Sequence, residues 1–110
     1  MQPFRWFEGR LRAEEVRLDA IAGSAGTPVY VYSTAAIGAA YRRLKAAFSP
    51  LGAELHYAVK ANPNLHLLRL LRGLGAGMDV VSGGELERAW LAGTPMEEIS
   101  FAGVGKTEEE

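Results

Sequence analysis

Residues 54–102 read ELHYAVKANPNLHLLRLLRGLGAGMDVVSGGELERAWLAGTPMEEISFA, and this stretch decides the fold. Three short segments, 54–60, 78–81 and 99–102, are typical of strands, and their centres near residues 57, 79 and 101 are 22 residues apart each time. A segment with helical periodicity separates each run from the next. Parallel strands need such crossover connections, so the spacing predicts an α/β fold built of consecutive βα units.

This regular spacing of strands and helices is typical of a (β/α)8 barrel, although a doubly wound open sheet has the same local pattern. A closed barrel needs eight units and about 250 residues, whereas these 110 residues supply three units after an opening strand and helix. We therefore expect the N-terminal portion of a (β/α)8 barrel, incomplete in this chain. Residues 1–26 are predicted to lead into the barrel, and residues 27–110 to form its first βα units.

Upstream of the repeat, residues 29–32 (VYVY) are expected to form the opening strand, and residues 13–22 a short helix of good helix formers. Ser33 or Thr34 can cap the helix that follows. Within the repeat, Asn62 is the expected cap of the next helix, because a proline follows it at the first helical position.

Capping-box spacing, a Ser or Thr followed three residues later by Glu, occurs at residues 82–85 and again at 107–110. Each pair predicts the start of a helix. At Ser82 and Glu85 this spacing accounts for both residues without a catalytic role.

The composition is that of an ordinary globular chain, with 48% hydrophobic and 23% charged residues and a formal charge of −1. This balance argues against disorder and against a nucleic-acid partner. The absence of cysteine excludes disulfides and zinc–cysteine sites. No apolar run approaches the ~20 residues of a membrane span, and no signal-peptide core follows Met1. We therefore expect a cytoplasmic protein with no membrane partner and no metal.

The run 54–60 ends in a lysine whose position suggests chemistry. Strand alternation predicts two faces, one with Leu55, Tyr57 and Val59 and the other with His56, Ala58 and Lys60. If the first set packs on helices, Lys60 points into the barrel at the carboxyl end of its strand, where barrel enzymes build their sites. Desolvation lowers an amine pKa, and the neutral amine is the nucleophile of Schiff-base chemistry. Position alone leaves open a strand-end lysine with its ammonium in solvent.

Four segments in register resemble one enzyme family. Residues 57–62 (YAVKAN) resemble the pyridoxal-phosphate lysine motif of fold-type III decarboxylases. Residues 27–33 (TPVYVYS), 75–86 (GAGMDVVSGGEL) and 99–107 (ISFAGVGKT) are similar to further segments of the diaminopimelate decarboxylases, in the same order. One such motif is weak support, whereas four in order make the chain resemble the N-terminal part of that family.

The resemblance implies a pyridoxal-phosphate-dependent decarboxylase that converts meso-2,6-diaminopimelate into L-lysine and carbon dioxide, the last step of lysine biosynthesis, and that acts as a homodimer. It implies that Lys60 holds pyridoxal 5'-phosphate as a Schiff base. It places Asp79 near the cofactor, where a carboxylate stabilises a protonated amine or imine. The plainer alternative for Asp79 is a polar residue at a strand end. The family's groups for the phosphate, the pyridine nitrogen and the substrate lie beyond residue 110, so this chain alone is expected to be inactive.

Three alternatives remain open at this point. The same fold serves ornithine, arginine and carboxynorspermidine decarboxylases, whose substrate-reading residues also lie outside this stretch. A non-catalytic pyridoxal-phosphate-binding barrel protein and a structural remnant without cofactor are the others. His56 is expected to be a hydrogen-bonded core histidine.

Overall fold

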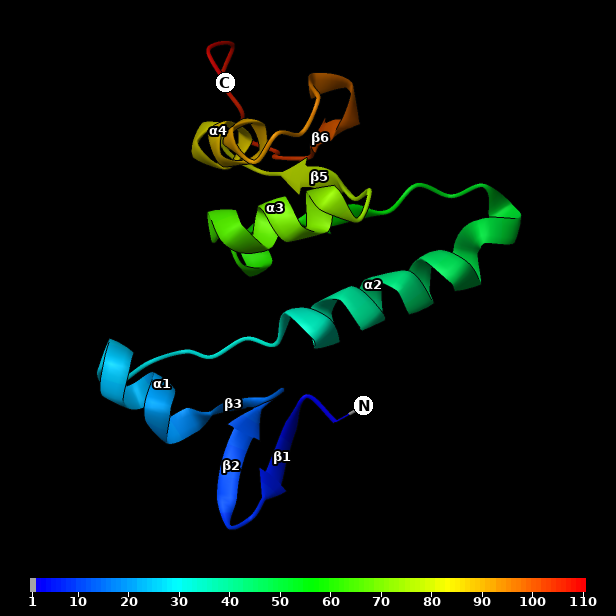
Figure 1. Ribbon diagram of the computed structural model, residues 1–110. Helices are drawn as coiled ribbons and strands as arrows, with labels where there is room; N and C mark the ends of the chain where they lie inside the picture. Colours follow the sequence, from blue (N-terminus) through cyan, green and yellow to red (C-terminus); the bar gives the residue numbers. More distant parts are fainter. Residues whose placement is uncertain (1) are drawn as a thin grey trace. The chain divides into compact units, whose positions relative to one another are not determined.

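The computed structural model describes residues 2–110, which form two compact units with the boundary after Ala40 (Figure 1). Helix α2 (Thr34–Phe48) begins in the first unit and ends in the second.

The first unit is built on a small antiparallel sheet of order β1-β2-β3, with β1 at Phe4–Phe7, β2 at Arg10–Ala13 and β3 at Val16–Arg17, followed by α1 at Leu18–Ala25. The predicted helix over 13–22 is therefore wrong in its first half. Helix propensity favours residues 13–15, but Ala13 pairs with both Phe4 and Val16 and is only 6% exposed. Cross-strand pairing and burial thus override the local preference.

The turn between β2 and β3 is tied to the start of α2. The Glu14 carboxylate accepts hydrogen bonds from the Ala35 backbone N–H (3.0 Å) and the Ser33 hydroxyl (2.7 Å). These contacts, with that of Ala35 the larger, lower the pKa of Glu14 below its ordinary 4.5. Ser33 Oγ in turn accepts from the Ala36 N–H at 3.0 Å, which confirms Ser33 as the cap of this helix.

Residues 29–32 do not form the predicted strand. They have no regular secondary structure, and no segment among residues 2–110 pairs with them. The rings of Tyr30 and Tyr32 stack on each other, with centroids 6.5 Å apart, and both side chains are exposed. A β-branched and aromatic run becomes a strand only beside a partner that completes its hydrogen-bond ladder.

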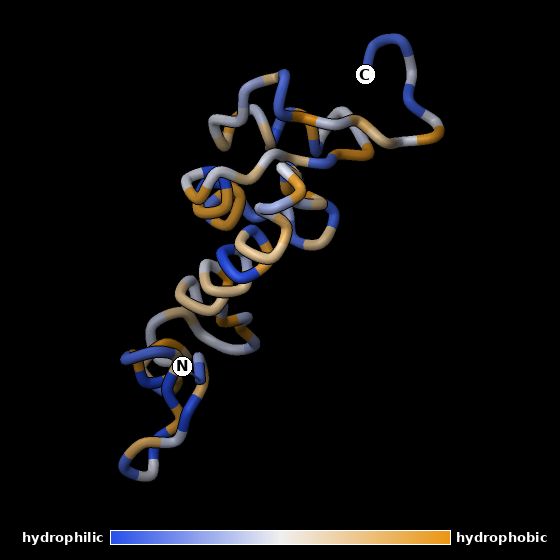
Figure 2. Tube along the Cα trace, turned by 90° about the vertical axis from the view of Figure 1, so that its right-hand side faces the viewer, coloured by the Kyte–Doolittle hydropathy of each residue, from blue (hydrophilic) through white to orange (hydrophobic). Residues whose placement is uncertain are grey.

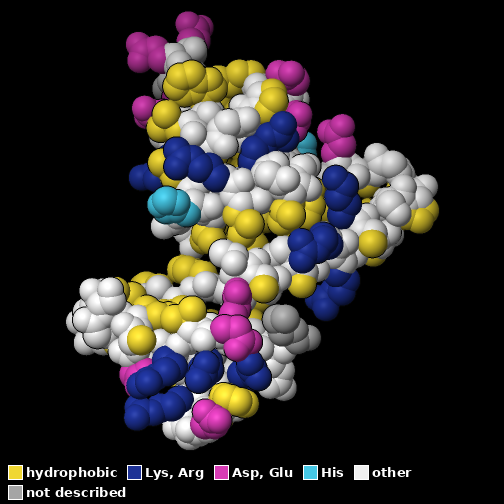
Figure 3. Space-filling model, viewed as in Figure 1, with side chains coloured by type: hydrophobic (Ala, Val, Ile, Leu, Met, Phe, Trp, Pro, Cys, Tyr) yellow, Lys and Arg dark blue, Asp and Glu magenta, His cyan; other side chains and the backbone are white. Residues whose placement is uncertain are grey.

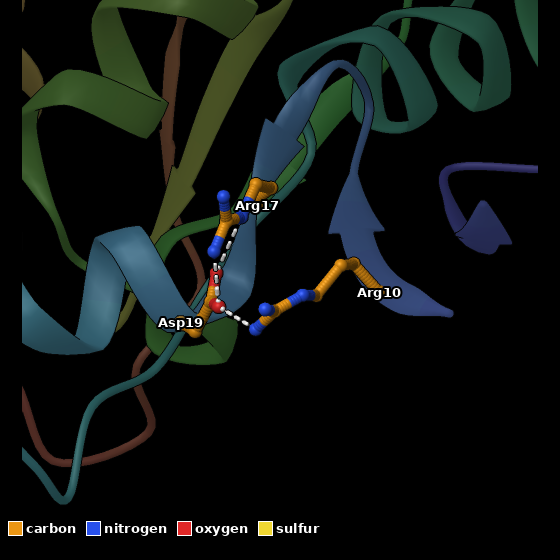
Figure 4. Close-up of polar contacts among 3 residues, drawn as sticks. All are labelled: Arg10, Arg17 and Asp19. Carbon is orange, nitrogen blue, oxygen red and sulfur yellow. Dashed lines mark hydrogen bonds and ion pairs between the residues drawn. The ribbon is translucent and has the colours of Figure 1, made fainter. Parts of the chain in front are cut away.

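Arginine and acidic side chains gather together on the first unit (Figure 3). Figure 4 shows the best-defined group, in which Asp19 accepts from Arg10 on one side and from Arg17 on the other. The Arg17 contact is bidentate, at 2.9 and 2.6 Å, and the Arg10 contact measures 2.7 Å. The hydrogen bond from Arg17, with the positive charges of both arginines, lowers the pKa of Asp19 to about 2.

The second unit contains the predicted βα repeat. Its strands β4 (His56–Ala58), β5 (Gly77–Val80) and β6 (Ile99–Phe101) are parallel and lie in the order β4-β5-β6. Helices α3 (Leu65–Gly73) and α4 (Gly83–Leu91) make the crossovers, and the short 3-10 helices are η1 (Ser49–Leu51), η2 (Val59–Ala61) and η3 (Met96–Glu98). The α/β prediction and the parallel strand order are confirmed.

The core of the second unit lies on the helix-covered face of this sheet. Met78 and Val80 of β5 are completely buried, as are Leu68 of α3 and Ala89 of α4. Helix α4 packs on β5 and β6, and α3 packs on α4. The acidic end at 108–110 is hydrophilic (Figure 2).

The caps are partly as predicted. Ser82 Oγ accepts from the Glu85 N–H at 3.2 Å, and the Glu85 carboxylate accepts from the Val81 N–H at 3.0 Å, so the capping box is confirmed. The cap of α3, however, is Asn64, whose Oδ1 accepts from the His66 N–H at 2.9 Å. Asn62 is not the cap, because its side chain accepts from the Asn64 N–H (3.1 Å) and shapes the turn before the helix.

Among residues 2–110, no helix is both long and apolar enough to cross a bilayer. Over the same residues, no three His, Asp or Glu side chains are grouped closely enough to hold a metal ion.

Candidate functional site

Lys60 lies just beyond β4 rather than within it. The strand ends at Ala58, and Val59–Ala61 form the 3-10 turn η2. The predicted alternation therefore does not reach Lys60. The chain leaves the sheet where the Val59 side chain enters the core, completely buried, while Lys60 is exposed. Lys60 nevertheless stands at the carboxyl end of the strand, the end at which barrel enzymes place their sites.

The Lys60 amine is available for chemistry. Within residues 2–110 it forms neither an ion pair nor a hydrogen bond. An exposed lysine without a carboxylate partner keeps its reach and its freedom of orientation.

Asp79 occupies the neighbouring strand on the open face of the sheet. In the parallel register it lies level with Ala58 of β4 and Ser100 of β6. Strand alternation directs it away from Met78 and the helix-covered face. It is half-buried and has no hydrogen bond or ion pair among the described residues. Because η2 contacts β5, Lys60 and Asp79 sit on adjacent segments.

The backbone directly after the turn that carries Lys60 is held by two side chains. The Tyr57 hydroxyl donates to the Asn62 carbonyl oxygen at 3.3 Å, and Arg88 Nη1 of α4 donates to the Pro63 carbonyl oxygen at 3.1 Å. Sequence reasoning missed both contacts. Every residue offers the same carbonyl acceptor, so no residue type marks the place where such a bond forms.

His56 is hydrogen-bonded as predicted, but it is half-buried on the open face of the sheet and does not belong to the core. Its Nδ1 lies 3.0 Å from Ser100 Oγ, so the side chains of β4 and β6 meet across β5. Gly77 of β5 makes room for them, since a Cβ there would lie 2.6 Å from His56 Nε2. His56 belongs to the opposite end of β4 from Lys60 and does not join the candidate site.

The fold and the site together define a class of protein. Residues 34–110 match the family model described as "Pyridoxal-dependent decarboxylase, pyridoxal binding domain". The chain belongs to this family of pyridoxal-dependent decarboxylases, and its α/β fold is the N-terminal portion of the fold-type III barrel.

Its relatives narrow the family further. The chain is 51% identical over 110 residues to the diaminopimelate decarboxylase of Pseudomonas fluorescens, which covers 100% of this chain and 26% of the relative. It is 52% identical over 103 residues to the diaminopimelate decarboxylase of Aquifex aeolicus, covering 94% of this chain and 24% of the relative. The chain thus spans about a quarter of the length of these curated relatives.

Solved structures agree with this placement. A crystal structure of a protein from Aquifex aeolicus is similar with a TM-score of 0.93 at 49% identity, covering 98% of this chain and 27% of that one. A diaminopimelate decarboxylase from M. jannaschii, solved with L-lysine, is similar with a TM-score of 0.92 at 40% identity, covering 98% and 26%. These likenesses confirm the resemblance drawn from the four sequence segments.

The residues present fit pyridoxal phosphate. An aldehyde cofactor requires an amine that is not engaged elsewhere, and Lys60 has one. A carboxylate nearby favours the cationic form of that amine or of its adduct, and Asp79 offers one without a competing partner among residues 2–110. Lys60 on η2 and Asp79 on β5 lie on adjacent segments.

Proposed function

We propose that this chain forms part of a pyridoxal-phosphate-dependent decarboxylase that converts meso-2,6-diaminopimelate into L-lysine and carbon dioxide. In this reaction one carbon–carboxylate bond breaks, carbon dioxide leaves, and a proton takes its place on the same carbon. Relatives of that name, 44–52% identical to this chain, favour this substrate over ornithine and arginine.

The observation that carries the proposal is the placement of Lys60. It is an exposed, unpaired amine among residues 2–110, on a turn at the carboxyl end of a parallel strand. A lysine that merely solubilised a strand end would need no fixed backbone. Here the backbone on its carboxyl side is bonded from β4 and from α4.

Lys60 and Asp79 then each have a task. Lys60 would hold the cofactor through its amine, which is the group that reacts with an aldehyde. Asp79 stabilises positive charge beside that amine. Pyridoxal phosphate, when bound, supplies an electron sink for the pair left by the departing carboxylate.

The rest of the proposal concerns the complete protein. Residues 1–26 lead into the barrel, and residues 27–110 form its first βα units. The protein acts in the cytoplasm as a homodimer, in lysine biosynthesis. The extent of the family match, residues 34–110, supports the barrel assignment.

Covalent trapping tests the role of Lys60. The complete protein is incubated with pyridoxal phosphate, reduced with borohydride, and digested for mass spectrometry. We expect the added mass on the peptide that contains Lys60. Before reduction, we expect the visible absorbance band of the bound cofactor in the wild-type protein and not in Lys60→Ala. Lys45→Ala, which removes another exposed lysine of the second unit, is the matched control and should keep the band. A band that persists in Lys60→Ala contradicts the assignment.

Carbon dioxide release tests the substrate. The complete enzyme is compared on meso-diaminopimelate, ornithine and arginine at equal concentrations. Release from diaminopimelate alone supports the proposal, and faster release from ornithine or arginine refutes the substrate while leaving the lysine assignment intact.

A further inference from the structure

We propose that Tyr57 is a positioning residue for Lys60, which holds the backbone of the lysine's turn through its hydroxyl. The inference rests on the proposed function, since it takes Lys60 as the residue that binds the cofactor.

The hydrogen bond from Tyr57 crosses the turn that carries Lys60. Tyr57 lies in β4, three positions before Lys60, and pairs in register with the completely buried Met78. Its hydroxyl donates to the carbonyl oxygen of Asn62, two positions after Lys60, at 3.3 Å. The hydrogen bond therefore spans the whole of η2, from the strand that precedes the turn to the residue that follows it.

The turn is supported independently on its two sides. Its first residue, Val59, is fixed by complete burial of its side chain. Beyond it, the carbonyl groups of Asn62 and Pro63 accept bonds from different elements, Tyr57 of β4 and Arg88 of α4. Within this turn, the side chain of Lys60 forms no hydrogen bond or ion pair with the described residues.

This arrangement fixes the backbone near Lys60 and leaves its amine free. A nucleophile must keep its amine free and yet present it at a fixed place. Here the backbone is fixed and the amine is free. Without the Tyr57 hydroxyl, the turn can adopt other conformations. The turn must then become ordered when the cofactor binds, which lowers the affinity for the cofactor. A hydrogen bond of ordinary net strength corresponds to about a two- to tenfold change in a dissociation constant.

The experiment uses the complete protein and compares Tyr57→Phe with Tyr41→Phe. Tyr41 is the matched control, because it is 9% exposed and its hydroxyl is buried without a hydrogen-bond partner among residues 2–110. The readouts are the dissociation constant of pyridoxal phosphate, the rate of covalent capture by Lys60, and the thermal midpoint without cofactor. We expect about two- to tenfold weaker and slower binding in Tyr57→Phe and wild-type binding in Tyr41→Phe.

A second pair of variants tests the other support. Arg88→Met removes the bond to Pro63, whereas Arg69→Met removes an exposed arginine that has no hydrogen bond or ion pair among the described residues. Arg88→Met should weaken the cofactor's binding in the same direction as Tyr57→Phe, and Arg69→Met should not.

The outcomes separate the two proposals. Wild-type affinity and capture rate in Tyr57→Phe, with or without a lower thermal midpoint, overturn the positioning role and leave the function of Lys60 in place. Covalent capture that persists in Lys60→Ala overturns the proposed function, and the positioning role fails with it. A loss of affinity in Tyr41→Phe equal to that in Tyr57→Phe also overturns the positioning role, because it shows a general effect of removing a hydroxyl.

Discussion

The side chains of His56 and Ser100 meet across the middle strand of the parallel sheet, with His56 Nδ1 3.0 Å from Ser100 Oγ. They come from the two outer strands, and Gly77 of β5 pairs with His56 beneath them. The absence of a side chain at Gly77 is what permits this contact. A Cβ there would lie 2.6 Å from His56 Nε2 and 2.8 Å from the Glu98 carbonyl oxygen.

Gly77→Ala should therefore destabilise the protein by about 1–3 kcal/mol, the usual effect of overpacking, because the Glu98 oxygen belongs to the backbone and cannot rotate away. Urea denaturation of the complete protein measures the change. Gly73→Ala is the control, since a Cβ at that helix end meets nothing within 4 Å. Equal stability of the Gly77→Ala protein would contradict the close packing of these three strands.

Asp79→Asn should weaken the binding of pyridoxal phosphate without loss of stability. Its carboxylate has no partner among residues 2–110, so no native contact is lost. A half-exposed charge interaction is worth up to about 1 kcal/mol, or roughly fivefold in the dissociation constant. Absorbance titration measures the affinity, with Glu97→Gln, an exposed carboxylate outside the strands, as the control. Unchanged affinity in Asp79→Asn would remove Asp79 from the site.

Ser82→Ala should cost about 0.5–2 kcal/mol of folding free energy, because the Glu85 N–H loses its side-chain acceptor at the start of α4. Denaturant titration checks the value. Ser24→Ala, an exposed serine within α1, should change stability little or raise it slightly. If the two variants were equally stable, the cap at Ser82 would contribute nothing.

Asp19→Asn should lower the thermal midpoint at neutral pH and lose this effect in acid. The pKa of Asp19 is depressed from 3.8 to about 2 by Arg17 and Arg10, so its stabilising contribution is complete above pH 3.8. The contribution declines as the pH falls from 3.8 to about 2, where the folded-state carboxylate takes up its proton. The thermal midpoints of the wild-type protein and of Asp19→Asn should therefore converge as the pH falls through this range. A constant difference would show that the ion pairs do not hold Asp19 in its charged form.

The parts of the fold that could be predicted have local signals. The three parallel strands and α4 follow from apolar runs, glycines and the Ser82–Glu85 capping box, all read within a few residues. The hairpin of the first unit was missed because its stability depends on pairing across strands, such as Ala13 with Phe4. Residues 29–32 have strand composition, but composition does not supply a hydrogen-bonding partner.

The sequence predicts candidate site residues but not their geometry. Lys60 and Asp79 were singled out by motif and position, and the structure brings their segments together. The alternation of side chains along a strand, however, predicted that Lys60 lies within the strand. This alternation does not show at which residue the hydrogen bonding between strands ends. The hydrogen bonds from Tyr57 and Arg88 to backbone carbonyls could not be predicted from the sequence either, because every residue has the same carbonyl oxygen.

The sequential order of the parallel sheet has a consequence for how the chain acquires its structure. Paired residues of neighbouring strands, such as 56 with 77 and 78 with 99, are 21 positions apart in both cases. Closing such short loops costs little chain entropy, and each closure also brings a crossover helix onto the growing layer. The second unit can thus assemble in the direction of synthesis, one strand and one helix at a time, with each new segment finding its docking surface already built by the one that emerged before it.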